Sequence, residues 1–183
     1  FVGRLWDAIS DPLVGYLSDR TKSSRGRRRS WMLASAIPIA ITTVMLWSPP
    51  SMLEGLALVF WMAAALLLYE TASTAFFVPY GALGMELSQD YHERTRLFGY
   101  RHVIAAAGTL FGLGAIYLLR TAENPREVAF ALSSVAGITM AATILYSVRA
   151  LPEREDYRGR GATSAFKAFF DVLRNPHGRL LFL

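Results

Sequence analysis

Two carboxylates one helical turn apart stand in the first apolar stretch of the chain. Asp7 and Asp11 lie in the string FVGRLWDAISDPLVGYL, together with Arg4 and Gly15. At about 100° per residue, these four positions fall on one face of a helix. Carboxylates at i and i+4 can bind one small cation or share a proton, and the alternative is an Arg4–Asp7 ion pair that serves packing alone. Because one arginine leaves an excess of negative charge, the spacing favours a cation site.

The free-energy cost of placing these charges in a membrane indicates which way the charged face of the helix points. Three charged side chains at mid-bilayer oppose insertion by roughly 8 kcal/mol on insertion scales. The first span, predicted over residues 1–18, therefore needs its charges to face other helices or a polar cavity. Pro12 cannot donate a hydrogen bond to the carbonyl of Ala8, so that oxygen is also available near the carboxylates.

Composition indicates a membrane protein, and we expect an all-α, polytopic fold. The chain has 183 residues, of which 53% are hydrophobic, and no cysteine. Further apolar runs predict spans over residues 31–47, 55–85, 102–119 and 128–148, with a polar loop over 88–101. Gly108 and Gly112 have the spacing of a close helix–helix approach. The chain begins inside a helix without an initiator Met, which predicts a piece of a longer protein.

The distribution of basic residues predicts the orientation. The segments 20–29, 88–101 and 149–179 hold six, three and seven Lys or Arg, whereas 48–54 and 120–127 hold none and two. One set of alternate loops thus holds sixteen Lys or Arg residues and the other set holds two. By the positive-inside rule, the basic loops are predicted to be cytoplasmic. We expect a multi-pass protein of the cell (inner, cytoplasmic) membrane and no nucleic-acid partner.

Two sets of motifs resemble a known family. Gly15, Asp19 and Arg20, followed by Gly26 and Arg27, resemble the loop motif between helices two and three of the major facilitator superfamily. The string RLWDAISDP at residues 4–12, VPYGAL at 78–83 and DYHERTR at 90–96 resemble the glycoside–pentoside–hexuronide:cation symporters, the family of melibiose permease.

The resemblance implies the N-terminal part of a twelve-helix fold. Residues 1–148 would be helices two to six, 149–179 the central cytoplasmic loop with a short amphipathic helix, and 180–183 the start of helix seven. The implied function is cation-coupled symport by alternating access, with Asp7, Asp11 and Ser10 binding Na⁺ or H⁺. Asp19 and its motif would brace the cytoplasmic gate, although a plain positive-inside anchor explains Arg27 equally well.

Five further side chains are candidates for substrate binding or coupling. Arg4 would tether the empty carboxylates, and Arg101 lies near the position of an arginine that supports the binding site in the family. Glu70 is an intramembrane acid, which is either functional, or hydrogen-bonded to a neighbouring helix, or near a membrane interface. Trp6 and Tyr80 would line a sugar site or serve as packing anchors.

The expected substrate is a sugar or glycoside. The alternative is a lysophospholipid or another amphiphile, because residues 68–71 and 77–80 resemble the animal lysophosphatidylcholine symporter. We expect no enzyme activity and no cofactor, since cysteine is absent and the three histidines are predicted at loop or boundary positions. No metal is expected beyond a possible Na⁺ at Asp7 and Asp11. The expected partners are the small-molecule substrate, the coupling cation and the bilayer, around a monomer.

Overall fold

The chain folds into a bundle of helices. The computed structural model describes residues 2–87 and 90–151, with only the backbone described for residues 2, 4 and 5. The described helices are α1 (Val2–Arg20), α2 (Arg27–Trp47), α3 (Gly55–Leu87), α4 (Tyr91–Thr121) and α5 (Pro125–Ala150), and this part of the chain contains no strand. The all-α prediction is confirmed. The predictions for residues 152–183, including the amphipathic helix and the start of helix seven, lie outside the described residues.

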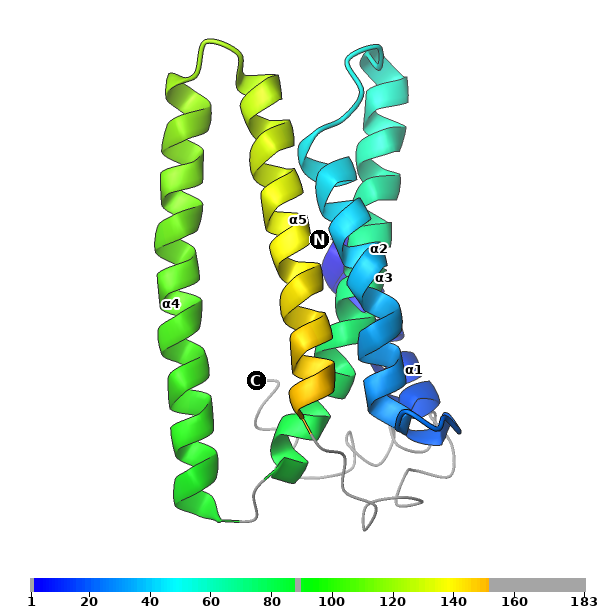
Figure 1. Ribbon diagram of the computed structural model, residues 1–183. Helices are drawn as coiled ribbons and strands as arrows, with labels where there is room; N and C mark the ends of the chain where they lie inside the picture. Colours follow the sequence, from blue (N-terminus) through cyan, green and yellow to red (C-terminus); the bar gives the residue numbers. More distant parts are fainter. Residues whose placement is uncertain (1, 88–89, 152–183) are drawn as a thin grey trace.

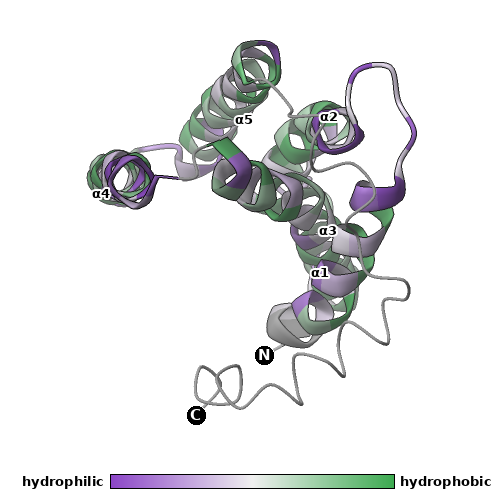
Figure 2. Cartoon of the chain, turned by 90° about the horizontal axis from the view of Figure 1, so that it is seen from below, coloured by the Kyte–Doolittle hydropathy of each residue, from purple (hydrophilic) through white to green (hydrophobic). Residues whose placement is uncertain are grey.

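Helix α2 packs against three other helices of the bundle, namely α1, α3 and α5. Viewed along the bundle, α4 stands at the edge, away from α1, α2 and α3 (Figure 2). The main contacts run between α2 and α3, α2 and α5, and α1 and α3, while α4 contacts chiefly α5 (Figure 1). No residue of α4 is buried, so α4 is the least integrated helix of the bundle.

The buried apolar core joins α2, α3 and α5. Its members are Met32, Ala36, Ile39, Ala72, Leu83, Ile144 and Val148. Among the described glycines, Gly137 lies closest to the backbone of another helix, since an added Cβ would lie 2.9 Å from the carbonyl oxygen of Ala40. By contrast, a Cβ at Gly108 or Gly112 would meet nothing within 4 Å. The predicted close approach at that pair is therefore not found among the described residues, and the α2–α5 crossing uses Gly137 instead.

Several helices begin earlier than the apolar runs suggest. Helix α4 starts at Tyr91 rather than at residue 102, so the predicted loop over 88–101 is wrong from Tyr91 onward. The side chain of Asp90 accepts a hydrogen bond from the backbone N–H of Glu93 at 2.9 Å, which caps the helix. Helix α2 starts at Arg27 after Gly26, whose φ of 100° is a backbone conformation that favours glycine.

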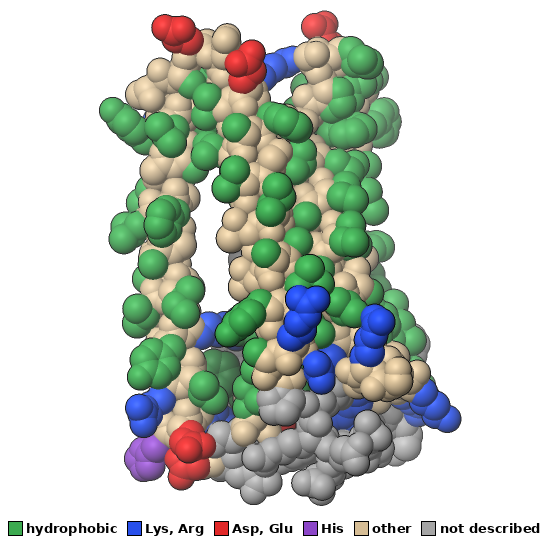
Figure 3. Space-filling model, viewed as in Figure 1, with side chains coloured by type: hydrophobic (Ala, Val, Ile, Leu, Met, Phe, Trp, Pro, Cys, Tyr) green, Lys and Arg blue, Asp and Glu red, His purple; other side chains and the backbone are tan. Residues whose placement is uncertain are grey.

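The outer surface of the bundle is apolar along its length. Large hydrophobic side chains are exposed on all five helices and are spread along the visible face, while most of the visible Lys and Arg lie toward the lower end (Figure 3). Helices α2 to α5 are each long and apolar enough to cross a membrane. The protein is therefore a multi-pass membrane protein. Helix α1, which has 19 residues and five charges, does not belong to that apolar group.

Candidate functional site

Polar side chains connect α1 to α3 along one line of contact, formed by Trp6, Ser10 and Asp11 of α1 and by Thr71 and Thr74 of α3, which we call the α1–α3 seam. The hydroxyl of Thr74 donates to Oδ1 of Asp11 at 3.1 Å, and it lies 3.4 Å from the hydroxyl of Ser10. One turn toward the start of α1, the indole N–H of Trp6 donates to the hydroxyl of Thr71 at 2.9 Å. The predicted residues Trp6, Ser10 and Asp11 therefore lie together on the face of α1 that packs against α3.

Three carboxylates share this seam. Asp7 and Asp11 both lie within electrostatic range of Glu70 on α3. Glu70 packs against the backbone of Gly3, since a Cβ added there would lie 3.2 Å from its Oε1. No group of three or more acidic or histidine side chains in the described part is arranged to hold a metal ion by itself. A cation at this seam would need hydroxyl or carbonyl oxygens beside the carboxylates, and Ser10 and Thr74 supply the hydroxyls.

The prediction for the side chain of Arg4 lies outside the described part of the chain. The backbone of α1 nevertheless carries residues 4, 7 and 11 as a continuous helix, as the spacing predicts. Pro12 lies inside this helix and lacks the N–H that would bond to the Ala8 carbonyl.

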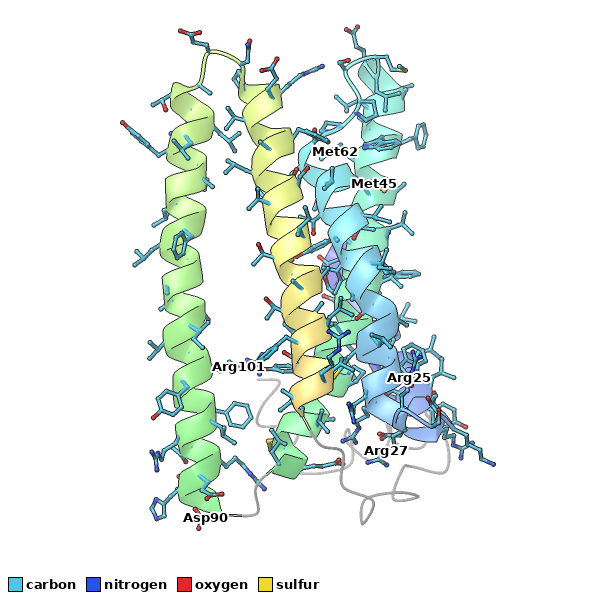
Figure 4. The ribbon with its side chains drawn as sticks, in the orientation of Figure 1. Arg25, Arg27, Met45, Met62, Asp90 and Arg101 are labelled. Atoms are coloured by element: carbon cyan, nitrogen blue, oxygen red, sulfur yellow. The ribbon has the colours of Figure 1, made fainter. Side chains whose placement is uncertain are left out.

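Tyr80 and Arg101 form a second group, away from the carboxylates. The guanidinium of Arg101 lies 5.5 Å from the centre of the Tyr80 ring, which stacks on Phe76 at 5.2 Å between centroids. Both residues line a cavity of about 160 Å³ between α3 and α4. Ten residues separate Tyr80 from Glu70, or about 15 Å along the helix. Arg101 lies within α4, well above Asp90, which caps the start of this helix (Figure 4), and not at the end of the predicted loop over 88–101.

The predicted gate motif lies at the lower end of the bundle, where Arg25 and Arg27 are seen in Figure 4. Asp19 forms an ion pair with Arg28 at 2.8 Å, and Glu86 on α3 forms ion pairs with Arg28 at 2.5 Å and Arg27 at 3.0 Å. The side chains of Arg27, Arg28 and Glu86 are 7%, 10% and 12% exposed. We call Asp19, Arg27, Arg28 and Glu86 the charge cluster.

The other members of the motif shape this end of the bundle. The guanidinium of Arg20 lies 4.4 Å from the centre of the Tyr16 ring. A Cβ at Gly15 would lie 3.6 Å from Val78, so Gly15 belongs to the packed α1–α3 seam. Gly26 supplies the turn that starts α2.

Three residues of these sites were missed by sequence reasoning. Thr74 stands one turn after Glu70, so the i, i+4 spacing on α3 was the signal for it. Glu86 is an acid at the basic end of an apolar run, which is where a partner for a buried arginine is needed. Arg28 belongs to the basic block, but its sequence position alone does not distinguish it from its neighbours.

Comparison with known proteins places the chain in a family. Residues 1–183 match the family described as MFS/sugar transport protein. An uncharacterized symporter of Synechocystis sp. is 32% identical over 84% of this chain and 29% of its own length. A sodium-dependent lysophosphatidylcholine symporter of Danio rerio is 39% identical over 61% of this chain and 21% of its own length. A sphingosine-1-phosphate transporter of Xenopus tropicalis is 37% identical over 61% of this chain and 22% of its own length.

The chain thus spans less than a third of the length of these curated relatives. The relatives are transporters rather than enzymes, and several are symporters. The chain belongs to the MFS/sugar transport protein family of the major facilitator superfamily.

Proposed function

We propose that the chain is part of a Na⁺-coupled symporter in which Asp7 and Asp11 bind the cation with the hydroxyls of Ser10 and Thr74. The observation that carries this proposal is the hydrogen bond from Thr74 to Asp11, which joins a carboxylate of α1 to a hydroxyl of α3. Oxygen ligands of this mixed kind suit a hard cation. The names of several relatives include sodium dependence, which favours Na⁺ over H⁺.

Coupling follows from the charge of the seam. With no cation bound, Asp7, Asp11 and Glu70 repel one another at one place in the bundle. A bound Na⁺ offsets that repulsion and draws α1 and α3 together, which favours the conformation that binds substrate. Arg4, on the same face of α1, would neutralise the carboxylates when the site is empty. Substrate tightens Na⁺ binding by the same factor, because binding free energies are reciprocal.

The topology we propose is that of helices two to six of a twelve-helix transporter, followed by the central loop. α1 crosses the membrane with its charged face toward α3 and the substrate pathway, and its apolar side chains toward lipid. The basic end, which holds the charge cluster, faces the cytoplasm of the cell membrane. Asp19, Arg20, Gly15, Gly26 and Arg27 would then brace the cytoplasmic gate.

The substrate class we favour is an amphiphile with an anionic headgroup, such as a lysophospholipid. Between Glu70 and Glu86, α3 carries no acid, and it presents the ring of Phe77, which is 54% exposed. Arg101 beside Tyr80 offers a cation to a phosphate group. Two relatives are named for lysophosphatidylcholine and sphingosine-1-phosphate. A sugar or glycoside is the second candidate, supported by the family's description and by aromatic rings suited to stacking on sugars.

The test is uptake by the full-length protein reconstituted in liposomes. Labelled lysophospholipids and labelled glycosides are supplied with an inward Na⁺ gradient, with a K⁺ control, and with a pH gradient alone. The proposal expects lysophospholipid uptake that needs the Na⁺ gradient. Na⁺-driven uptake of glycosides alone would replace the amphiphile with a sugar. Uptake that depends on neither the Na⁺ gradient nor the pH gradient would overturn the symport proposal.

A further inference from the structure

The carbonyl of Val148 near the end of α5 cannot be satisfied by its own helix. In an α-helix it would accept a hydrogen bond from the N–H four residues on, and that residue is Pro152, which has no N–H. The neighbouring carbonyl of Ser147 does receive its bond, from Leu151 N–H at 2.9 Å. The carbonyl of Val148 is therefore one of those in the last turn of α5 that need a donor from outside the helix.

Arg29 in the first turn of α2 supplies that donor. Its Nε donates to the Val148 carbonyl at 2.8 Å, and its Nη2 donates to the same oxygen. Val148 is 6% exposed and belongs to the apolar core, so without this donor its carbonyl would be poorly solvated. The positive charge also lies at the negative end of the α5 dipole, which strengthens the interaction.

Three consecutive arginines at the start of α2 thus contact three other helices. Arg27 and Arg28 bind Glu86 on α3, and Arg28 also binds Asp19 on α1. Arg29 binds the end of α5 instead. The contact of Arg29 is to a backbone oxygen, so it does not compete for the carboxylates of the charge cluster.

We propose that Arg29 caps the C-terminal end of α5, where Pro152 removes the donor that the helix would otherwise supply. Through this hydrogen bond, Arg29 fixes the end of α5 to the first turn of α2. The end of α5 then moves together with α2 and with the loop that precedes α2. When Arg29 withdraws, the last turn of α5 detaches while the core crossing at Gly137 stays in place. This inference is independent of the substrate and of the cation proposed above.

The experiment measures the exposure of the last turn of α5 in the full-length protein in nanodiscs. Leu151, which packs against the core, is replaced by cysteine in an otherwise cysteine-free background, and its maleimide labelling rate is followed. We expect Arg29→Gln to raise this rate about tenfold and Arg29→Lys to raise it less, because lysine keeps a charged donor. Arg25→Gln is the matched control, an exposed arginine of the preceding loop, and it should leave the rate unchanged.

The decisive comparison repeats Arg29→Gln in a Pro152→Ala background. Alanine gives residue 152 an N–H and removes the restriction that proline places on Leu151, which is extended at the end of α5. The helix can then continue by one residue and supply the Val148 carbonyl with its own donor, so the increase caused by Arg29→Gln should fall to less than half. An equal increase in both backgrounds would mean that Arg29 acts by packing or charge alone, and the proposal would be wrong. The proposal would also be overturned if the cysteine at position 151 were labelled at the same rate in the Arg29→Gln variant as in the parent with Leu151→Cys alone. If Arg29→Gln folds poorly, the same comparison is made with Arg29→Lys.

Discussion

The hydroxyl of Thr74 lies 3.1 Å from Oδ1 of Asp11, and this hydrogen bond joins α1 to α3 at the level of the carboxylate pair. Thr74 is 6% exposed, so its position is set by the surrounding helices rather than by solvent. A hydroxyl can donate to a carboxylate while its lone pairs remain free for a cation. The seam therefore places oxygens from two helices together, which reduces the cost of assembling a cation site.

Replacing Thr74 by valine removes this hydroxyl and nearly keeps the volume of the side chain. We expect Na⁺ affinity to fall about tenfold, or about 1.4 kcal/mol, since hydrogen bonds to charged groups have about this value. Thr74→Ser should retain most of the affinity. Calorimetric titration of Na⁺ into the purified full-length protein measures the effect. Thr139→Val on α5, whose hydroxyl bonds to its own helix at Val135, is the control. Unchanged affinity in Thr74→Val would remove Thr74 from the proposed site.

Glu86→Gln should destabilise the protein. It removes the carboxylate at the lower end of α3 that Arg27 and Arg28 of α2 share. The expected loss is about 3 kcal/mol, because removing one charge of a buried ion pair leaves the other charge poorly compensated. Thermal unfolding in detergent, followed by intrinsic fluorescence, measures it as a lower Tm. Glu54→Gln at the opposite end removes an exposed acid and should change the Tm little. Equal effects of the two substitutions would contradict the importance of the charge cluster.

The two kinds of glycine in the bundle should respond in opposite ways to alanine. At Gly137 the new Cβ would meet the Ala40 carbonyl at 2.9 Å, so α2 and α5 must move apart, at a cost of about 1–3 kcal/mol. At Gly108 there is no neighbour within 4 Å, and alanine should be neutral or stabilising by about 0.5–1 kcal/mol. The Tm values of Gly137→Ala and Gly108→Ala, measured side by side, check this. A lower Tm for Gly108→Ala alone would show that the packing is misassigned.

The sequence predicts the helices well where apolar runs are long, and poorly where helices extend beyond them. The start of α4 was missed because residues 91–101 are polar, although Asp90 and Glu93 have the spacing of a capped helix start. The carboxylate pair on α1 was found because its members are one turn apart. Thr74 and Glu86 were missed because their partners lie 63 and 59 residues away, and such contacts depend on how the helices pack.

The glycine spacing shows the same limit. Gly108 and Gly112 have the pattern of a close approach, but α4 contacts the bundle too little to use it. Gly137 has no glycine four residues away, but Ser133 and Ala141 stand at that spacing, and among the described glycines it lies closest to the backbone of another helix. Spacing within a helix indicates which face carries small residues, and the neighbouring helix decides whether that face is used.

The most direct test of the account is Na⁺ binding and Na⁺-driven uptake by Asp7→Asn and Asp11→Asn in the full-length protein. Each substitution keeps the size of the side chain and removes one charge of the pair. The account predicts that each variant folds with a Tm near that of the parent, loses at least tenfold in Na⁺ affinity and no longer accumulates substrate against its gradient. Variants that accumulate substrate as well as the parent, with the same dependence on Na⁺, would contradict it.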